Sequence, residues 1–146
     1  MSWMRSGGVS AAVDWETANL VLAAALAGLI WTIQVVHYPL FALVGAAEWT
    51  RYGDEHRRRI TWLAAPLMLA SVAVALVLVV QDNDGLHVLN AGLAVGVFVL
   101  TGAVFAPMHG RLEHAASTRA IHALVRANWL RTIAWTAQVA CAVALV

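Results

Sequence analysis

One stretch of the chain decides the fold: LVLAAALAGLIWTIQVVHYPLFALV, at residues 20–44. It contains no acidic residue, and it exceeds the roughly 20 apolar residues that a helix needs to cross the ~30 Å hydrocarbon core of a bilayer. Three further runs of the same kind follow at 60–80, 86–106 and 124–146. These four runs predict an all-α integral membrane protein built as a four-helix bundle.

The composition agrees with a protein that is dissolved in lipid. Of the 146 residues, 62% are hydrophobic and 12% are charged. In soluble domains about a quarter of the residues are charged. The four runs leave no room for a soluble part, so we expect one transmembrane domain over residues 1–146. The lipid bilayer is the expected partner, and the net charge of +1 gives no indication of nucleic acid. A single cysteine, Cys141, excludes a Cys-x-x-Cys redox pair.

The basic residues predict the orientation of the chain. All nine are arginine, and only Arg5 lies outside the two long connections and the start of the last run. The other eight are Arg51, Arg57, Arg58, Arg59, Arg111, Arg119, Arg126 and Arg131. Cytoplasmic segments of membrane proteins are enriched in arginine and lysine. We therefore expect a multi-pass protein of the inner (plasma) membrane, with up-down-up-down topology and both termini on the outer side.

Local signals predict where helices end and how they pack. Pro107 is expected to end the third helix, and Asp54 to cap the start of the second. Gly92 and Gly96 are four residues apart, a spacing that favours close helix packing within the chain, with a homo-oligomeric contact as the alternative.

Histidines gather on the predicted cytoplasmic side, which holds five of the six: His37, His56, His109, His114 and His122. His37 lies inside the first run, two residues before Pro39, which cannot donate a backbone N–H; the helical ladder should therefore open beside the imidazole. His37 can be interpreted as a histidine hydrogen-bonded to a neighbouring helix, and His56 as a solvated surface residue. The alternative for both is a metal site in which His37, His56 and His109 are the ligands. Such a site would hold iron rather than copper, or a haem.

A polar stripe runs along the last helix. Asn128, Arg131, Thr132, Trp135 and Gln138 recur at helical spacing. An arginine inside a membrane needs a partner unless it snorkels to the interface, and an acidic ligand or a haem propionate would supply one. We expect Gln34, Asn128 and Arg131 to bind a ligand, with Trp31 and Trp135 forming the walls of a pocket for a flat ring. Core filling is the alternative for both tryptophans.

Several short motifs resemble a known family. They are HYPLF (37–41), WTRYGDEHRRR (49–59), AAPLM (64–68), PMHGRLEH (107–114) and NWLRTIAWT (128–136). This combination resembles the anthrone-oxygenase-like group of small four-helix bacterial membrane proteins, which is of unknown function. The resemblance implies activity on aromatic or other oxidisable small molecules with dioxygen. The chain departs from the pattern at Ser71, where an acidic residue is expected, and after Leu112, where a Gly/Asp turn is expected.

Three functions are compatible with these patterns. The first is a metal- or haem-dependent oxidoreductase or oxygenase that acts on a small molecule, for which an aromatic compound is one candidate. The second is a non-catalytic accessory subunit of a larger membrane complex, in which the histidines hold a pigment or haem. The third is a small transporter, which ranks last because no acidic residue lies within the four runs.

Overall fold

The chain is helical along nearly its whole described length, which confirms the all-α prediction. The computed structural model describes residues 14–114 and 118–146, with side chains up to 110 and from 119 onward. Its helices are α1 (Trp15–Thr32), α2 (Tyr38–Leu40), α3 (Trp49–Gln81), α4 (Gly85–Leu100), α5 (Ala106–His114) and α6 (Thr118–Leu145). Two π-helical segments, Ile33–His37 and Thr101–Phe105, join α1 to α2 and α4 to α5, and a 3₁₀ turn, Phe41–Leu43, follows α2.

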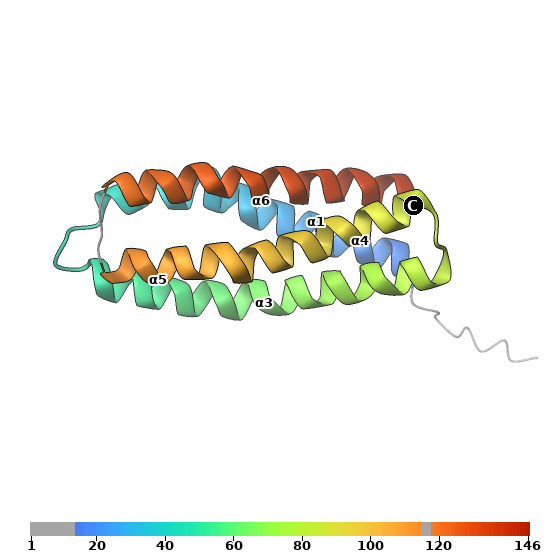
Figure 1. Ribbon diagram of the computed structural model, residues 1–146, viewed down its shortest axis with the longest axis horizontal. Helices are drawn as coiled ribbons and strands as arrows, with labels where there is room; N and C mark the ends of the chain where they lie inside the picture. Colours follow the sequence, from blue (N-terminus) through green and yellow to red (C-terminus); the bar gives the residue numbers. More distant parts are fainter. Residues whose placement is uncertain (1–13, 115–117) are drawn as a thin grey trace, which may run out of the picture.

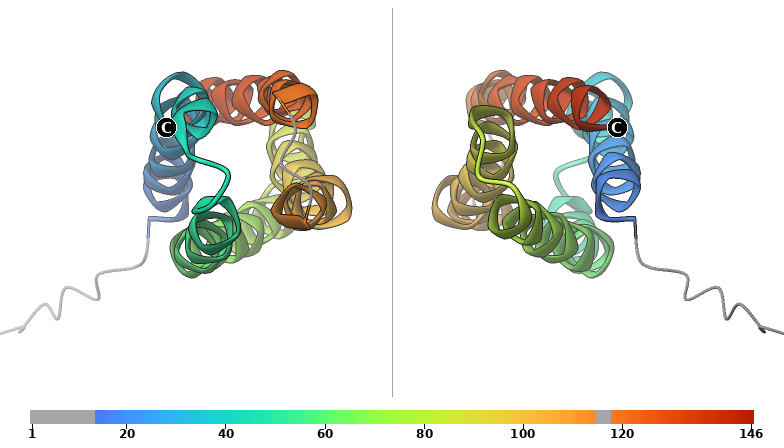
Figure 2. Two further views of the ribbon diagram at one scale, coloured as in Figure 1. Left: turned by 90° about the vertical axis from the view of Figure 1, so that its left-hand side faces the viewer. Right: turned by 90° about the vertical axis from the view of Figure 1, so that its right-hand side faces the viewer.

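The helices lie lengthwise around a common axis. The end views of Figure 2 place them at the corners of a square, with α1 and α4 each beside both α3 and α6. The connection at residues 44–48 lies at the left-hand end of Figure 1, and the turn between α3 and α4 lies at the right-hand end, near the C-terminus. We call the left-hand end the arginine-rich end, because Arg51 and residues 57–59 follow the 44–48 connection there.

Three helical stretches in the described residues are long and apolar enough to cross a membrane: Trp15–Leu43, Trp49–Gln81 and Gly85–Gly110. The fourth, α6, is not among them. Its composition is less apolar because it carries the polar stripe, and the stripe residues Asn128, Arg131, Thr132 and Gln138 are all buried. The polar groups of α6 therefore face the interior of the bundle, where other helices and not lipid surround them.

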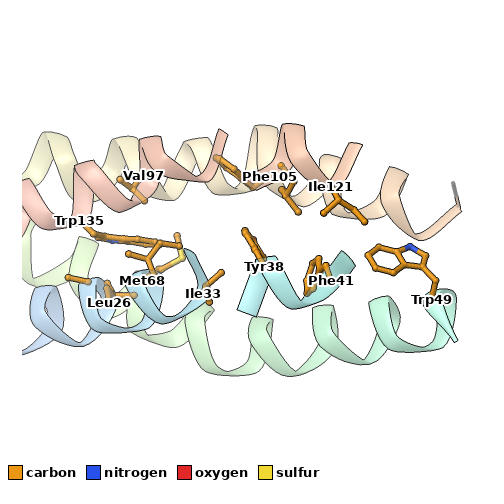
Figure 3. Packing of buried hydrophobic residues seen from close by; sticks show 13 residues of the cluster. Leu26, Ile33, Tyr38, Phe41, Trp49, Met68, Val97, Phe105, Ile121 and Trp135 are labelled. Atoms are coloured by element: carbon orange, nitrogen blue, oxygen red, sulfur yellow. The ribbon is translucent and has the colours of Figure 1, made fainter. Parts of the chain in front are cut away.

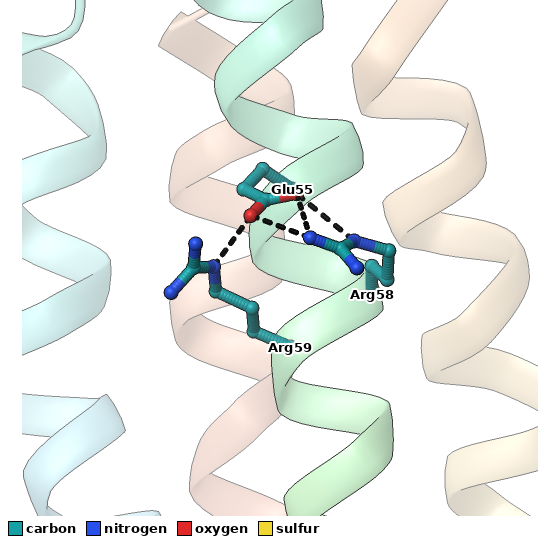
Figure 4. A network of polar contacts seen from close by, with 3 residues as sticks. All are labelled: Glu55, Arg58 and Arg59. Atoms are coloured by element: carbon teal, nitrogen blue, oxygen red, sulfur yellow. Dashed lines mark hydrogen bonds and ion pairs between the residues drawn. The ribbon is translucent and has the colours of Figure 1, made fainter.

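The helix α3 begins well before its apolar run. Residues 49–59 are helical, and Glu55 accepts hydrogen bonds from Arg58 and from Arg59, one turn further on (Figure 4). The expectation that Asp54 caps this helix is wrong, because Asp54 lies inside it and pairs with Arg57 at 3.1 Å. These pairs are exposed, and solvent screening leaves exposed ion pairs with little net contribution to stability. They extend the helix but do not hold the bundle together.

Each π-helical segment is followed closely by a proline. Pro39 comes two residues after the segment Ile33–His37, and Pro107 comes two residues after Thr101–Phe105. The helical ladder is thus interrupted beside His37, as the sequence predicted. The expectation that Pro107 ends the third helix is wrong, because α5 continues to His114. A wider π turn accommodates the missing N–H of a proline without breaking the helix, and such turns are frequent at functional sites.

The core runs along the bundle axis. Figure 3 shows Trp135, Met68, Tyr38, Phe41 and Trp49 following one another between the helices. All five are buried.

The glycines of α4 lie outside this packing. A Cβ atom added to Gly92 or Gly96 would meet no heavy atom within 4 Å, so the expected close packing of helices at these glycines within the chain is wrong.

Candidate functional site

Tyr38 and His109 lie at the centre of a cluster of polar side chains inside the bundle. The ring Nδ1 of His109 lies 2.7 Å from the carbonyl oxygen of Phe105, which can only accept, so Nδ1 carries a proton. In the neutral imidazole Nε2 is then an acceptor, and the Tyr38 hydroxyl donates to it at 3.0 Å. The backbone of the π-helical segment therefore sets the tautomer of His109.

Arg131 lies against this pair. The residue is 7% exposed, and its guanidinium stacks over the Phe105 ring at 4.2 Å, measured from Cζ to the ring centroid. One terminal nitrogen lies 3.5 Å from the Tyr38 oxygen, at the limit of a hydrogen bond. Among the side chains that the structure describes, no carboxylate pairs with Arg131. The side chain thus points into the bundle and does not snorkel to the interface.

Two amides hold Arg131 in place. Gln34 donates to the carbonyl of Val125 at 3.2 Å and accepts from the amide nitrogen of Asn128 at 2.7 Å. The Asn128 oxygen accepts from Arg131 Nε at 2.9 Å. The relay crosses from the first π-helical segment to α6, and it fixes Nε while leaving the far edge of the guanidinium directed toward Tyr38.

A cavity of about 280 Å³ opens beside these groups. The polar side chains that line it are Tyr38, His56, Arg57, Thr61, Thr101, His109 and Arg131. The rest of the wall is mostly apolar, and includes Ile30, Ile33, Ile60, Met68, Phe98, Phe105 and Trp135. An apolar cavity with a few converging polar groups is the usual form of a small-molecule site, although this one is at the lower end of the ~300–1,000 Å³ range.

The other two predicted ligands form a pair of their own. His37 Nε2 and His56 Nδ1 lie 2.8 Å apart, and the ring centroids of His56 and His109 are 6.0 Å apart. Both histidines also line a second cavity with Tyr52. Two nitrogens on one tetrahedral ion with bonds of 2.0–2.1 Å stand about 3.3 Å apart. The contact between His37 and His56 is thus a hydrogen bond, and the two nitrogens would have to move apart by about 0.5 Å to share an ion. Among the described residues, His37, His56 and His109 do not bring three ligating atoms within 4.8 Å of one another.

The structure brings most of the sequence-predicted residues together, with some exceptions. Gln34, Asn128, Arg131, Trp135 and the three histidines line the cavity or are hydrogen-bonded to residues of this cluster. Trp31 is elsewhere: it is 41% exposed, donates to Thr136 and packs edge-on against Trp129. His122 is exposed on α6, and the side chain of His114 lies outside the described residues.

Two central residues were not predicted as ligand-binding groups. Tyr38 links His109 to Arg131, and its position between His37 and Pro39 in the interrupted helix was the available signal. Phe105 supplies both the carbonyl that orients His109 and the ring beneath Arg131. No sequence pattern marks Phe105, because its role depends on which helix faces it.

A second polar group lies at the opposite end, in the turn before α4. Asp82, Asp84 and His87 place one potential metal-ligating atom each within 4.8 Å of one another. Asp84 caps α4 by accepting from the backbone N–H groups of Leu86 and His87. The pKa of Asp84 is lowered mainly by the hydrogen bond from the backbone N–H of His87, and next by the hydrogen bond with the His87 ring. Helix capping accounts for this arrangement without an ion.

Comparison with protein-family models, with curated proteins and with solved structures finds no match to this chain. The resemblance to the anthrone-oxygenase-like group therefore stays a prediction, and function is argued from the site alone.

Proposed function

We propose that this chain is a four-helix oxidoreductase or oxygenase of the inner membrane that binds a small, weakly acidic aromatic molecule in the cavity beside Arg131. In this proposal α6 is the fourth membrane span. The topology is up-down-up-down, with the arginine-rich end in the cytoplasm and both termini outside.

The observation that carries the proposal is the buried guanidinium of Arg131. Keeping a lone charge away from water costs several kcal/mol, and placing arginine at membrane depth costs at least ~2.5–3.5 kcal/mol. Asn128 and Tyr38 provide hydrogen bonds but no negative charge. A phenolate or carboxylate in the cavity would supply that charge and complete the site.

The side chains around the cavity suit acid–base work on such a molecule. Arg131 stabilises the anionic oxygen of the ligand, and this favours loss of its proton. His109 Nε2 is the acceptor for that proton, directly or by way of the Tyr38 hydroxyl, which already donates to it at 3.0 Å. Trp135 and Phe105 provide apolar walls for a ring. An electron-rich phenolate is easier to oxidise than the phenol, which connects this chemistry with an oxidoreductase.

A metal ion is the proposed cofactor, and of the three predicted ligands His37 and His56 would hold it. His109 serves instead as the proton acceptor, because its Nδ1 donates to Phe105 and its Nε2 accepts from Tyr38. The close pair of His37 and His56 supports this arrangement, and iron is preferred to copper at a cytoplasmic site. Bound iron would exchange electrons with the ligand or with dioxygen. A haem does not fit: a cavity of about 280 Å³ is small even for drug-sized ligands, and a macrocycle would displace the core around it.

Binding of 4-ethylphenol to the purified full-length protein tests the proposal. We expect Arg131→Gln to weaken binding about tenfold or more, since a hydrogen bond to a charged group contributes ~1.5–3 kcal/mol. Arg131→Lys, which keeps the charge, should retain part of the affinity. Arg126→Gln, which removes an exposed arginine from the same helix, is the matched control. Equal affinity of wild type and Arg131→Gln, or equal competition by ethylbenzene, would sink the proposal.

Metal content and an absorption spectrum test the cofactor separately. Protein purified in mild detergent and supplied with ferrous iron should hold it in stoichiometric amount. The variants His37→Ala and His56→Ala should lose it, whereas His122→Ala, which changes an exposed histidine, should not. Iron retained in all three variants, or absent from wild type, would refute a metal site at His37 and His56. Copurification of stoichiometric partner proteins with an inert chain would instead favour the accessory-subunit alternative.

A further inference from the structure

We infer that the ligand reaches the cavity sideways from the lipid, through an opening between α3 and the stretch formed by Thr101–Phe105 and α5. The ligand would therefore be a lipophilic phenol whose apolar tail stays in the bilayer. This inference rests on the proposed function, because it concerns the same cavity.

The lining residues of the cavity that are exposed all lie on one side. They are Arg57 and Thr61 of α3 and, across from them, Phe98, Gly102 and Ala106. On the α1 and α6 sides the lining residues Ile30 and Trp135 are buried. A residue that contributes to both the cavity and the outer surface marks a mouth, so the cavity opens between α3 and the α4–α5 stretch.

Gly102 has room for a larger side chain. A Cβ atom added there would meet no heavy atom within 4 Å, although the residue lines the cavity. Gly102 lies inside the apolar run 86–106, and Thr61 is the second residue of the apolar run 60–80. With these runs in the bilayer, as proposed, the mouth would open to lipid near the arginine-rich side of the membrane.

The two ends of the cavity fit the two ends of an amphipathic molecule. Arg131, Tyr38 and His109 receive an acidic head at the inner end. The mouth is lined by Thr61, Phe98, Gly102 and Ala106, with Arg57 one helical turn before Thr61. A cavity of about 280 Å³ holds a single substituted ring, so a long tail has to leave through the mouth. A water-soluble ligand would have no use for an opening into lipid.

Displacement of tritiated 4-ethylphenol by 4-dodecylphenol, with the full-length protein in lipid nanodiscs, tests the inference. Concentrations are compared within the membrane, so that simple partitioning of the long chain is removed. The long-chain phenol should displace the short one from wild-type protein with at least equal affinity. In Gly102→Leu it should bind about tenfold more weakly, the loss of roughly two methylene contacts, whereas equilibrium binding of 4-ethylphenol should stay within about twofold.

Gly96→Leu is the matched control, because Gly96 is also exposed with open space around it and does not line the cavity. Ala106→Leu is a second variant at the mouth, in case Gly102→Leu fails to fold. If 4-ethylphenol binds and depends on Arg131 but 4-dodecylphenol does not compete, the lateral opening is refuted while the proposed function stands. An equal effect of Gly102→Leu and Gly96→Leu also refutes it. If neither phenol binds, the proposed function fails and this inference fails with it.

Discussion

The Tyr38 hydroxyl joins groups from three parts of the chain. It donates to His109, lies beside Arg131 and is itself 1% exposed. Removing one partner of a buried hydrogen bond leaves the other without water to replace it, and this costs more than the bond itself contributes. The Tyr38 hydroxyl is therefore expected to contribute both to the stability of the fold and to ligand binding.

We predict that Tyr38→Phe lowers the free energy of unfolding by about 1 kcal/mol, because the partly buried Nε2 of His109 then loses its donor. Thermal unfolding in detergent measures the change. Tyr52→Phe is the matched control: the Tyr52 hydroxyl makes no hydrogen bond among the residues that the structure describes, and its loss should change stability by less than about 0.5 kcal/mol. Equal losses in the two variants would show that the Tyr38 hydroxyl has no special role.

We also predict a pH-dependent contribution from the cap of α4. Hydrogen bonds, first from the backbone N–H of His87 and then with its ring, lower the pKa of Asp84. A lowered folded-state pKa means that the stabilisation is complete above the ordinary aspartate value of about 3.9 and is lost as the pH falls through the folded value. Asp84→Ala should therefore lower the Tm at pH 6, and the gap to wild type should narrow at pH 3. The exposed neighbour Asp82, changed to Ala, should not reproduce this pattern.

At the scale of the helices, buried amides hold neighbouring and opposite elements in register. Asn19 of α1 and Asn90 of α4 exchange hydrogen bonds of 3.4 and 3.2 Å and are fully buried. Gln138 of α6 donates to Ser71 of α3 at 2.9 Å. These contacts link diagonal helices, which the apolar core joins less directly. Each contact also fixes the rotation of its helix, since an amide turned toward lipid would lose its partner.

We predict that Asn19 and Asn90 are energetically coupled. Each single change to Ala should destabilise the protein, because it leaves the other amide buried without a partner. The double variant should cost less than the sum of the two, with a coupling energy of about 0.5–2 kcal/mol in a double-mutant cycle. Unfolding measurements on the four proteins give this number. Strict additivity would mean that the two amides do not rely on each other.

At the scale of the whole molecule, the two ends of the bundle differ in charge. The connection at 44–48 lies at the arginine-rich end, and the acidic turn before α4 lies at the other (Figure 1). Because cytoplasmic segments carry the positive charge, the arginine-rich end, which holds the site, is expected inside the cell. The cofactor would then be drawn from the cytoplasm, while the proposed ligand comes from the lipid.

Labelling of single cysteines tests this orientation. In a Cys141→Ser background, we expect a membrane-impermeant maleimide to modify Ala47→Cys only in inside-out vesicles and Asn83→Cys only in right-side-out vesicles. Ala47 and Asn83 are both exposed and lie in the connections at opposite ends. Labelling of both positions from the same side would contradict a chain that crosses the membrane between them.

The sequence by itself determined that this protein is helical, that its long runs belong in lipid and that His37, His109 and Arg131 are exceptional. Composition, run length and the cost of polar groups in hydrocarbon decide these points locally. Helix ends were less predictable, because surface pairs such as Glu55 with Arg58 extend α3 past its apolar run. A proline breaks a helix or is absorbed by a π turn according to its surroundings, which is why Pro107 was misjudged.

Only the tertiary structure decided which side chains meet. The roles of Tyr38 and Phe105, the exposed position of Trp31 and the open space beside Gly92 all depend on the rotation of one helix against another. That rotation follows from the sum of many packing contacts and a few buried amide bonds, and no single stretch of sequence contains it. The sequence shows that Arg131 lies inside an apolar run. Only the tertiary structure shows that no carboxylate pairs with it among the described side chains.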